Sequence, residues 1–173
     1  AKLKKYDKAG PRYTSYPTAP HFHENFRYED FLTEIRETNS TGNNKNLSLY
    51  FHLPYCDTLC YFCGCNMIIT RNRERVKEYL TYVKKEVEIV KGLLNKERKV
   101  TQLHWGGGTP THLNPDEIED LASFIKNRFE FDSESENSCE IDPRGLEFSH
   151  LEALRNNGFN RISMGVQDFD KKV

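Results

Sequence analysis

Four cysteines stand close together in the segment YCDTLCYFCGCN, at positions 55–66. Their spacing is C-x3-C-x2-C-x-C, and the four are Cys56, Cys60, Cys63 and Cys65. Thiols this close together in one loop suit three kinds of chemistry: a zinc site, a disulfide or an iron–sulfur cluster. Each kind of site requires a different spacing of the cysteines, and a disulfide also requires an oxidising cellular compartment.

The spacing favours an iron–sulfur cluster. Structural zinc sites usually pair two short knuckles a dozen or more residues apart, and the only cysteine outside the segment is Cys139. A Cys63–Cys65 disulfide would need unusual backbone geometry and an oxidising compartment. In a four-iron cube each iron takes one outside ligand. Thiolates of Cys56, Cys60 and Cys63 would leave the fourth iron open for a substrate or cofactor. Zinc remains the second alternative.

The composition predicts one globular, cytoplasmic protein. Of 173 residues, 36% are hydrophobic and 29% charged, and 25 Lys and Arg are balanced by 26 Asp and Glu. Extended disorder is excluded, and the scattered charges predict no nucleic-acid or membrane partner. No apolar run approaches the roughly 20 residues of a membrane span, and the first residues lack a signal peptide's apolar core. Reduced cytoplasmic thiols favour metal binding or catalysis over disulfides.

Strand and helix patterns alternate after a leader. Residues 1–46 predict an extended arm, one short helix at 29–39 and a polar loop. The next part predicts four strands, at 47–54, 100–105, 138–142 and 161–167. Between them it predicts three helices, at 74–95, from Pro115 after an Asn114 cap, and at 150–158. This order indicates a parallel α/β protein with right-handed crossovers.

Apolar and polar side chains alternate along each predicted strand. In the first strand the apolar face carries Leu47, Leu49, Phe51 and Leu53. The opposite face carries Ser48, Tyr50 and His52. In the fourth strand the apolar face carries Ile162, Met164 and Val166. Helices should cover only the apolar face, because strands covered on both faces are continuously apolar. The polar face then fits a ligand-filled cavity better than the aliphatic interior of an ordinary (β/α)8 barrel. An open sheet with one hydrated face is the alternative.

The cysteine segment resembles the signature of the radical S-adenosylmethionine (SAM) superfamily, with an aromatic residue, Phe62, before the third cysteine. Further segments are together similar to the oxygen-independent coproporphyrinogen III oxidase family of haem biosynthesis. These are GPRYTSYPTAPHF, LSLYFHLPYC, CYFCGCN, LHWGGGTPT, EIDPR and GFNRISMGVQDF. Haem-chaperone-like radical SAM proteins resemble the chain less, because GPRYTSYPTA and the fourth cysteine of CGCN are oxidase-type features.

The resemblance runs from about residue 6 to the last residue. It implies a partial (β/α) barrel of the radical SAM type, with about four parallel strands, flanking helices and an extended N-terminal arm. Residues 1–46 would form the arm and short helix. Residues 47–173 would form the first part of the barrel, truncated after the fourth strand.

The resemblance also implies the site. Cys56, Cys60 and Cys63 would hold a [4Fe–4S] cluster whose open iron is chelated by SAM, and Cys65 would not be a ligand. The family binds two SAM molecules. The residues implied for the cluster-bound molecule are Tyr50, Gly107 and Glu140. Those implied for the second are Phe62, Gly108, Thr109 and Gln167.

Several of these residues also have ordinary interpretations. Consecutive glycines let a ligand approach the backbone closely, but they also form tight turns. A carboxylate such as Glu140 could bind a ribose diol, or could simply be solvated or ion-paired. Phe62 could pack on adenine or anchor its loop. Cys139 is expected in the core, because it lies among apolar neighbours on its strand.

The reaction implied is the oxidative decarboxylation of coproporphyrinogen III to protoporphyrinogen IX. In this family a reduced cluster cleaves SAM to a 5′-deoxyadenosyl radical, which takes a hydrogen atom from a propionate before carbon dioxide leaves. The partners would be the porphyrinogen and an electron donor and acceptor of unknown identity. This 173-residue chain is expected to be inactive alone. The alternative is a haem-chaperone-like protein, or a haem or iron–sulfur binding module without oxidase activity.

Overall fold

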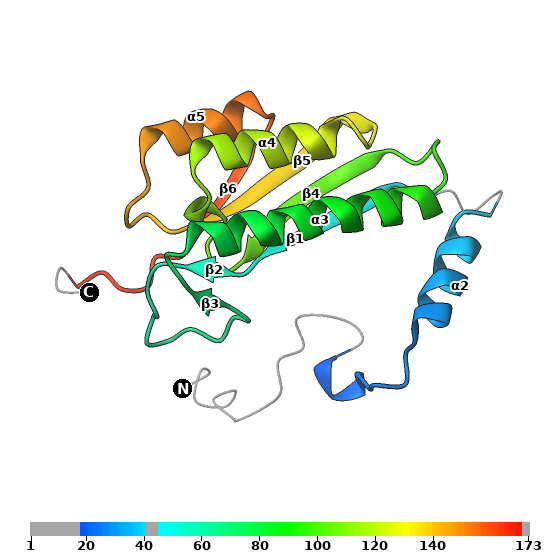
Figure 1. Ribbon diagram of the computed structural model, residues 1–173, viewed down its shortest axis with the longest axis horizontal. Coiled ribbons are helices and arrows are strands. Elements are labelled where there is room, and N and C mark those ends of the chain that lie inside the picture. Colours follow the sequence, from blue (N-terminus) through cyan, green and yellow to red (C-terminus); the bar gives the residue numbers. More distant parts are fainter. Residues whose placement is uncertain (1–17, 41–44, 171–173) are drawn as a thin grey trace, which may run out of the picture.

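The computed structural model of the chain describes residues 18–40 and 45–170. Its centre is a four-stranded sheet in the order β1-β4-β5-β6, and every neighbouring pair is parallel. The strands are β1 (Leu47–Leu53), β4 (Val100–Gly107), β5 (Phe131–Ile141) and β6 (Arg161–Met164). The alternation of strands and helices predicted from the sequence is therefore confirmed (Figure 1).

Three helices connect the strands and pack on one face of the sheet (Figure 1). They are α3 (Arg73–Leu93), α4 (Pro115–Lys126) and α5 (Phe148–Asn156). The cap predicted for α4 is present, because the Asn114 side chain accepts a hydrogen bond from the amide of Glu117 at 2.9 Å. Asn72 caps α3 in the same way. These caps satisfy amide groups of the first helical turn and so fix where both helices begin.

Burial along β1 and β4 follows the predicted alternation, whereas on β5 Ser138, predicted on the polar face, is only 7% exposed beside the buried Cys139. Leu53 and Trp105 are 2% and 0% exposed and join the core formed with the helices, whereas Tyr50 is 59% exposed on the opposite face. Cys139 is fully buried in the core, as expected. One face of the sheet is therefore packed and the other is open.

The prediction that helices cover the apolar face of the fourth strand is wrong. Ile162 and Met164 on β6 are 53% and 50% exposed. Among the described strands β6 pairs with β5 alone, so it forms an edge of the sheet and no described helix covers its apolar side chains. The strand also ends at Met164 and does not continue to position 167.

β5 begins earlier than predicted. The polar run DSESEN, from Asp132 to Asn137, gave no strand signal, but it belongs to β5, and its last two residues, Glu136 and Asn137, pair in parallel with Gln102 and Leu103 of β4. The pairing register shifts between Val100 and Gln102, so residues 132–135 form an irregular stretch between the paired residues Phe131 and Glu136.

The short helix predicted at 29–39 is α2 (Tyr28–Thr38), and it follows a single turn, η1 (Ala19–His21). The side chain of Asn39 donates to the carbonyl of Leu93 at 2.7 Å and accepts from the amide of Asn95 at 3.1 Å. These contacts join the end of α2 to the end of α3 (Figure 1). Most of the predicted arm and part of the polar loop lie outside the described residues.

None of the helices in the described ranges is long and apolar enough to cross a membrane.

Candidate functional site

The cysteine loop is closed at its base by a small parallel sheet. It consists of β2 (Tyr55–Cys56) and β3 (Ile68–Ile69). The amide of Ile68 donates to the carbonyl of Pro54 at 2.7 Å, and that of Thr70 donates to the carbonyl of Cys56 at 3.1 Å. This sheet was not predicted, because two-residue strands show no periodicity. It fixes both ends of the loop that carries Cys60, Cys63 and Cys65.

The glycine turn is bonded directly to this loop. The amide of Gly108 donates to the carbonyl of Leu53, and the amide of Thr109 donates to that of Tyr55, both at 2.9 Å. The Thr109 hydroxyl lies 3.4 Å from the sulfur of Cys56. The cysteine loop and the GGGTPT turn therefore form one unit at the carboxyl edge of β1 and β4.

Two glycines of the turn have packing reasons that need no ligand. Gly107 has a φ of +115°, which side chains other than glycine rarely adopt, and a Cβ there would lie 2.7 Å from Cε1 of His52. A Cβ on Gly108 would lie 2.6 Å from the carbonyl oxygen of Pro54. The ordinary interpretation of these glycines, a tight turn, therefore applies whether or not SAM also contacts them.

The three predicted cluster ligands are free, half-buried thiols, and Cys65 is free and exposed. The amide of Cys63 donates to the carbonyl of Cys60 at 3.1 Å, so these two lie on one turn of the loop. Burial raises the pKa of Cys56, the hydrogen bond with Thr109 opposes this, and the neighbouring Cys63 and Cys60 raise the pKa further. The thiols therefore lie close enough to influence one another.

The donor set fits a cluster better than a single ion. Across residues 18–40 and 45–170, no three His, Cys, Asp or Glu side chains converge on a point that one metal ion could occupy. A four-iron cluster does not need such a point, because each thiolate binds a different iron of the cube. Free thiols at Cys56, Cys60 and Cys63, in a loop fixed at both ends, meet this demand.

A guanidinium lies against one of the thiols. Nη2 of Arg144 donates to the sulfur of Cys60 at 3.0 Å and to Oδ2 of Asp142 at 2.6 Å. Hydrogen bonds from Arg144 hold the pKa of Asp142 below its ordinary value. Arg144 was not selected from the sequence. It follows β5, whose carboxyl end meets the same sheet edge as the cysteine loop, and this position is the signal that could have found it.

The open face of the sheet carries a polar network around Glu140. The Glu140 carboxylate accepts from the amide of Gly107 at 3.2 Å and lies 3.4 Å from Nε2 of His104. Nδ1 of His104 is 2.6 Å from the Ser138 hydroxyl. The Tyr50 ring stacks on the His104 ring, with centroids 5.8 Å apart and an interplanar angle of 15°. Three residues predicted for the first SAM molecule, Tyr50, Gly107 and Glu140, are thus brought together.

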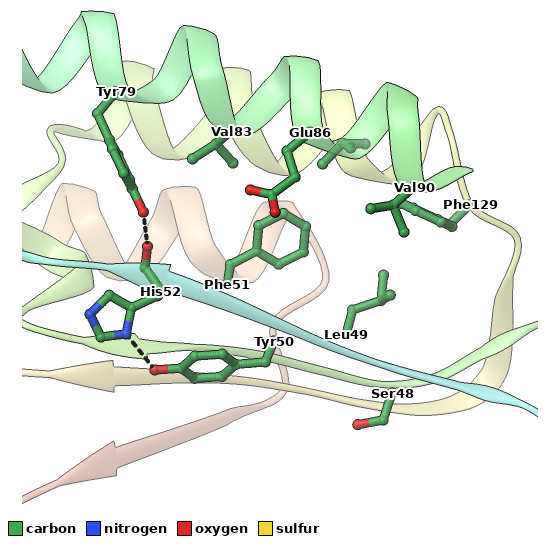
Figure 2. Close-up of a pocket in the computed structure, with 11 residues that line it drawn as sticks. Ser48, Leu49, Tyr50, Phe51, His52, Tyr79, Val83, Glu86, Val90 and Phe129 are labelled. Atoms are coloured by element: carbon green, nitrogen blue, oxygen red, sulfur yellow. Dashed lines mark hydrogen bonds between the residues drawn. The ribbon is translucent and has the colours of Figure 1, made fainter. Parts of the chain in front are cut away.

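His52 links this network to the cysteine loop. Its Nε2 lies 2.7 Å from the carbonyl oxygen of Asn66, which can only accept, so the proton of the neutral ring is on Nε2. Nδ1 then accepts from the Tyr50 hydroxyl at 3.0 Å (Figure 2). Burial, then the charge of Glu140, then Cys65 raise the pKa of Tyr50. His52 and His104 were both left out of the predicted site, and the structure places both beside it.

A cavity of about 320 Å³ lies between β1 and α3. Figure 2 shows Leu49 and Phe51 pointing toward α3 and Tyr50 pointing to the other side of β1. The cavity is lined mainly by apolar side chains and includes no cysteine and no residue of the glycine turn. Of the residues predicted to bind a cofactor, Tyr50 alone lines the cavity, so the cavity borders the predicted cofactor site along the first strand.

Two predicted residues remain outside these networks. Phe62, on the cysteine loop, is 62% exposed. Gln167 lies beyond the end of β6, exposed, with its side chain against Gly165. Within the described residues neither makes a hydrogen bond or ring contact with the other predicted site residues. The structure therefore brings together two parts of the predicted site and leaves Phe62 and Gln167 at its margin.

Comparisons with known proteins show the family to which the chain belongs. Residues 50–173 match the sequence profile of the radical SAM superfamily. The chain is 47% identical over 173 residues to the oxygen-independent coproporphyrinogen III oxidase of Escherichia coli (strain K12), covering 100% of this chain and 37% of that protein. The protein of the same name from Mannheimia haemolytica is 45% identical over 143 residues, which are 83% of this chain and 94% of that protein.

A solved structure confirms the predicted fold class. Coproporphyrinogen III oxidase (HemN) from Escherichia coli, described as a radical SAM enzyme, superposes with a TM-score of 0.85 and 45% identity. The match covers 99% of this chain and 37% of that one, so the chain spans little more than a third of the length of this relative. The cysteine loop, the glycine turn and the parallel sheet thus occur together in a chain that belongs to the radical SAM superfamily and, within it, to the oxygen-independent coproporphyrinogen III oxidases.

Proposed function

We propose that this chain takes part in the oxygen-independent oxidative decarboxylation of coproporphyrinogen III to protoporphyrinogen IX. The observation that carries the proposal is the meeting of the cysteine loop, the glycine turn and Glu140 at one edge of the sheet. The names of the relatives that match the whole chain support the substrate. They also favour the oxidase over the haem-chaperone-like alternative.

Cys56, Cys60 and Cys63 would hold a [4Fe–4S] cluster. When bound, the cluster supplies one electron that cleaves SAM to methionine and a 5′-deoxyadenosyl radical, which takes a hydrogen atom from a propionate of the substrate. The chain's own part is to fix the loop on β2 and β3 and to place a hydroxyl beside the Cys56 sulfur. Cys65, exposed in the same loop, is proposed not to be a ligand.

Glu140 would bind the ribose of the cluster-bound SAM, beside Tyr50 and Gly107. Its present contacts, 3.2 Å to the Gly107 amide and 3.4 Å to His104, are long for hydrogen bonds to a carboxylate. Two ribose hydroxyls could therefore bind the same oxygens without breaking a strong bond. The residues proposed for a second SAM molecule are Phe62, Gly108, Thr109 and Gln167.

The isolated 173-residue chain is proposed to bind the cluster without completing turnover. Tyr50, on the polar face of β1, is 59% exposed, and Ser163, on the polar face of β6, is also exposed. Water therefore reaches the face on which the radical would form, and catalysis of this kind depends on its exclusion. The cysteine loop is fixed locally by β2, β3 and the glycine turn, so cluster binding should not need a closed cavity.

Anaerobic reconstitution with iron and sulfide tests the proposal. We expect about four irons per chain, as a [4Fe–4S] cluster requires, and a change in the electron paramagnetic resonance (EPR) spectrum of the reduced cluster when SAM is added. Stoichiometric zinc in protein purified without oxygen would contradict the cluster. Haem binding without any response to SAM would favour a binding module.

A further inference from the structure

An exposed side chain makes the contact between Arg144 and Cys60. Arg144 follows β5, and its side chain is 61% exposed. Its guanidinium could satisfy its hydrogen bonds in water, yet Nη2 lies 3.0 Å from the Cys60 sulfur, across 84 positions of sequence. The contact therefore joins the loop after β5 to the cysteine loop.

Asp142 fixes the direction of this guanidinium. Its Oδ1 accepts from Nε of Arg144 at 3.0 Å and its Oδ2 accepts from Nη2 at 2.6 Å. Oδ1 also accepts from the backbone amide of Arg144 at 2.9 Å. A planar guanidinium held by two carboxylate oxygens has little freedom to turn away. The hydrogen of Nη2 that points to Cys60 is thus preorganised, although the side chain is exposed.

The neighbours of the three predicted ligands differ in charge. The Cys56 sulfur lies beside the neutral hydroxyl of Thr109, and Cys63 lies near the thiol of Cys65. In the described parts of the chain, Cys60 is the ligand that receives a hydrogen bond from a cation. Hydrogen bonds and charges next to the ligand sulfurs are among the main determinants of an iron–sulfur reduction potential.

We propose that Arg144 is a positioning residue for the cluster, and that its guanidinium, held by Asp142, raises the cluster's reduction potential through Cys60. The inference rests on the proposed function, because it requires a cluster at Cys60. Reduction adds one negative charge to the cluster, and a fixed cation nearby stabilises the reduced form more than the oxidised form. Since the guanidinium is exposed, water screens part of this effect.

A redox titration of the reconstituted chain without SAM, followed by EPR, tests the inference. At a fixed potential near the midpoint, Arg144→Gln should lower the ratio of reduced to oxidised cluster by up to about tenfold, which for a one-electron couple is about 59 mV. Arg144→Lys keeps the positive charge but loses the two-pronged guanidinium. Its reduction potential should lie between those of the parent and Arg144→Gln. Arg161→Gln is the matched control. Arg161 is 62% exposed and pairs with Glu136 at 2.8 Å, and its loss should leave the potential unchanged.

The outcomes separate this inference from the proposed function. If the parent chain assembles no cluster, the proposed function fails, and this inference fails with it. If the parent assembles a cluster and Arg144→Gln titrates at the same potential, the inference alone is overturned. The inference alone is also overturned if Arg144→Gln weakens SAM binding and leaves the reduction potential unchanged, because the guanidinium would then serve the SAM carboxylate. Loss of the cluster in Arg144→Gln with retention in Arg144→Lys would support a charge at Cys60, whereas loss in both variants would contradict it.

Discussion

The hydroxyl oxygen of Thr109 lies 3.4 Å from the sulfur of Cys56, which joins the glycine turn to the first predicted cluster ligand. A hydroxyl that donates to a thiolate stabilises its charged form, and the hydrogen bond with Thr109 accordingly opposes the rise in the pKa of Cys56. The turn can therefore act on the proposed cluster site as well as on the proposed SAM site.

Thr109→Val should weaken iron binding. Valine has nearly the shape of threonine but cannot donate a hydrogen bond, and loss of such an outer partner costs roughly tenfold or more in metal affinity. We expect iron to leave the reconstituted chain about tenfold faster in the presence of a chelator. Thr109→Ser, which keeps the hydroxyl, is the control and should behave like the parent. Equal rates for Thr109→Val and the parent would show that the contact has no effect on the cluster.

The cysteine assignment predicts two classes of serine variant. Cys56→Ser, Cys60→Ser and Cys63→Ser should each lose the cluster, because an iron–sulfur cube held by three thiolates has no spare ligand. Cys65→Ser should assemble it, since Cys65 is exposed and outside the predicted set. Iron content and the visible absorption after anaerobic reconstitution distinguish them. A Cys65 variant as empty as the other three would mean that the ligand assignment is wrong.

The sequence predicted the parts of the fold that carry a regular apolar pattern. The alternation from Leu47 to Leu53 predicted both β1 and its open polar face, and the spaced valines of α3 predicted that helix to within two residues at its C-terminal end. The start of β5 was missed, because residues 132–137 show no apolar alternation, and their pairing with β4 is irregular before Glu136.

Tertiary contacts explain what was missed in the site. Arg144 contacts a sulfur that lies 84 positions away in the sequence, and no local pattern predicts such a pair. A single inward histidine such as His104 is often structural, so its residue type alone does not assign it to the site. Its contacts with Ser138, Glu140 and the Tyr50 ring depend on the register of three neighbouring strands. The sequence therefore indicated which residues belong to the site more readily than it indicated which residues they contact.

Gly108→Ala should destabilise the chain. The new methyl group would meet the backbone of Pro54 and Tyr55, at 2.6 Å and 2.8 Å from their carbonyl oxygens, and overpacking of this kind costs about 1–3 kcal/mol. Gly92→Ala is the control. Gly92 lies in α3 with nothing within 4 Å of an added Cβ, so this change should stabilise by roughly 0.5–1 kcal/mol. Urea unfolding measures both. A Gly108→Ala variant as stable as the parent would remove the packing reason for this glycine.

The buried thiol of Cys139 should make the free energy of unfolding fall at alkaline pH. Burial, and secondarily the charge of Glu140, raises its pKa from 9.0 to about 12. Above pH 9 the unfolded chain loses this proton while the folded chain keeps it, so the unfolded state binds fewer protons and the free energy of unfolding falls as the pH rises. One fully titrating group changes the free energy of unfolding by at most about 1.4 kcal/mol per pH unit. Cys139→Ala should therefore show a shallower slope between pH 9 and 11 in urea unfolding. Identical slopes in parent and variant would contradict the raised pKa.

Glu140→Gln should separate SAM binding from cluster binding. Glutamine has the same length, and its amide oxygen can still accept from the Gly107 amide, now 3.2 Å from the carboxylate. The charge that would strengthen bonds to two ribose hydroxyls is lost, so we expect SAM affinity to fall about tenfold, since charge-assisted bonds are roughly twice as strong as neutral ones. Iron content should not change. Glu136→Gln is the control, because Glu136 lies on β5 but pairs with Arg161. Calorimetric titration of SAM into the reconstituted chain measures the affinities, and equal weakening in both variants would remove Glu140 from the proposed SAM site.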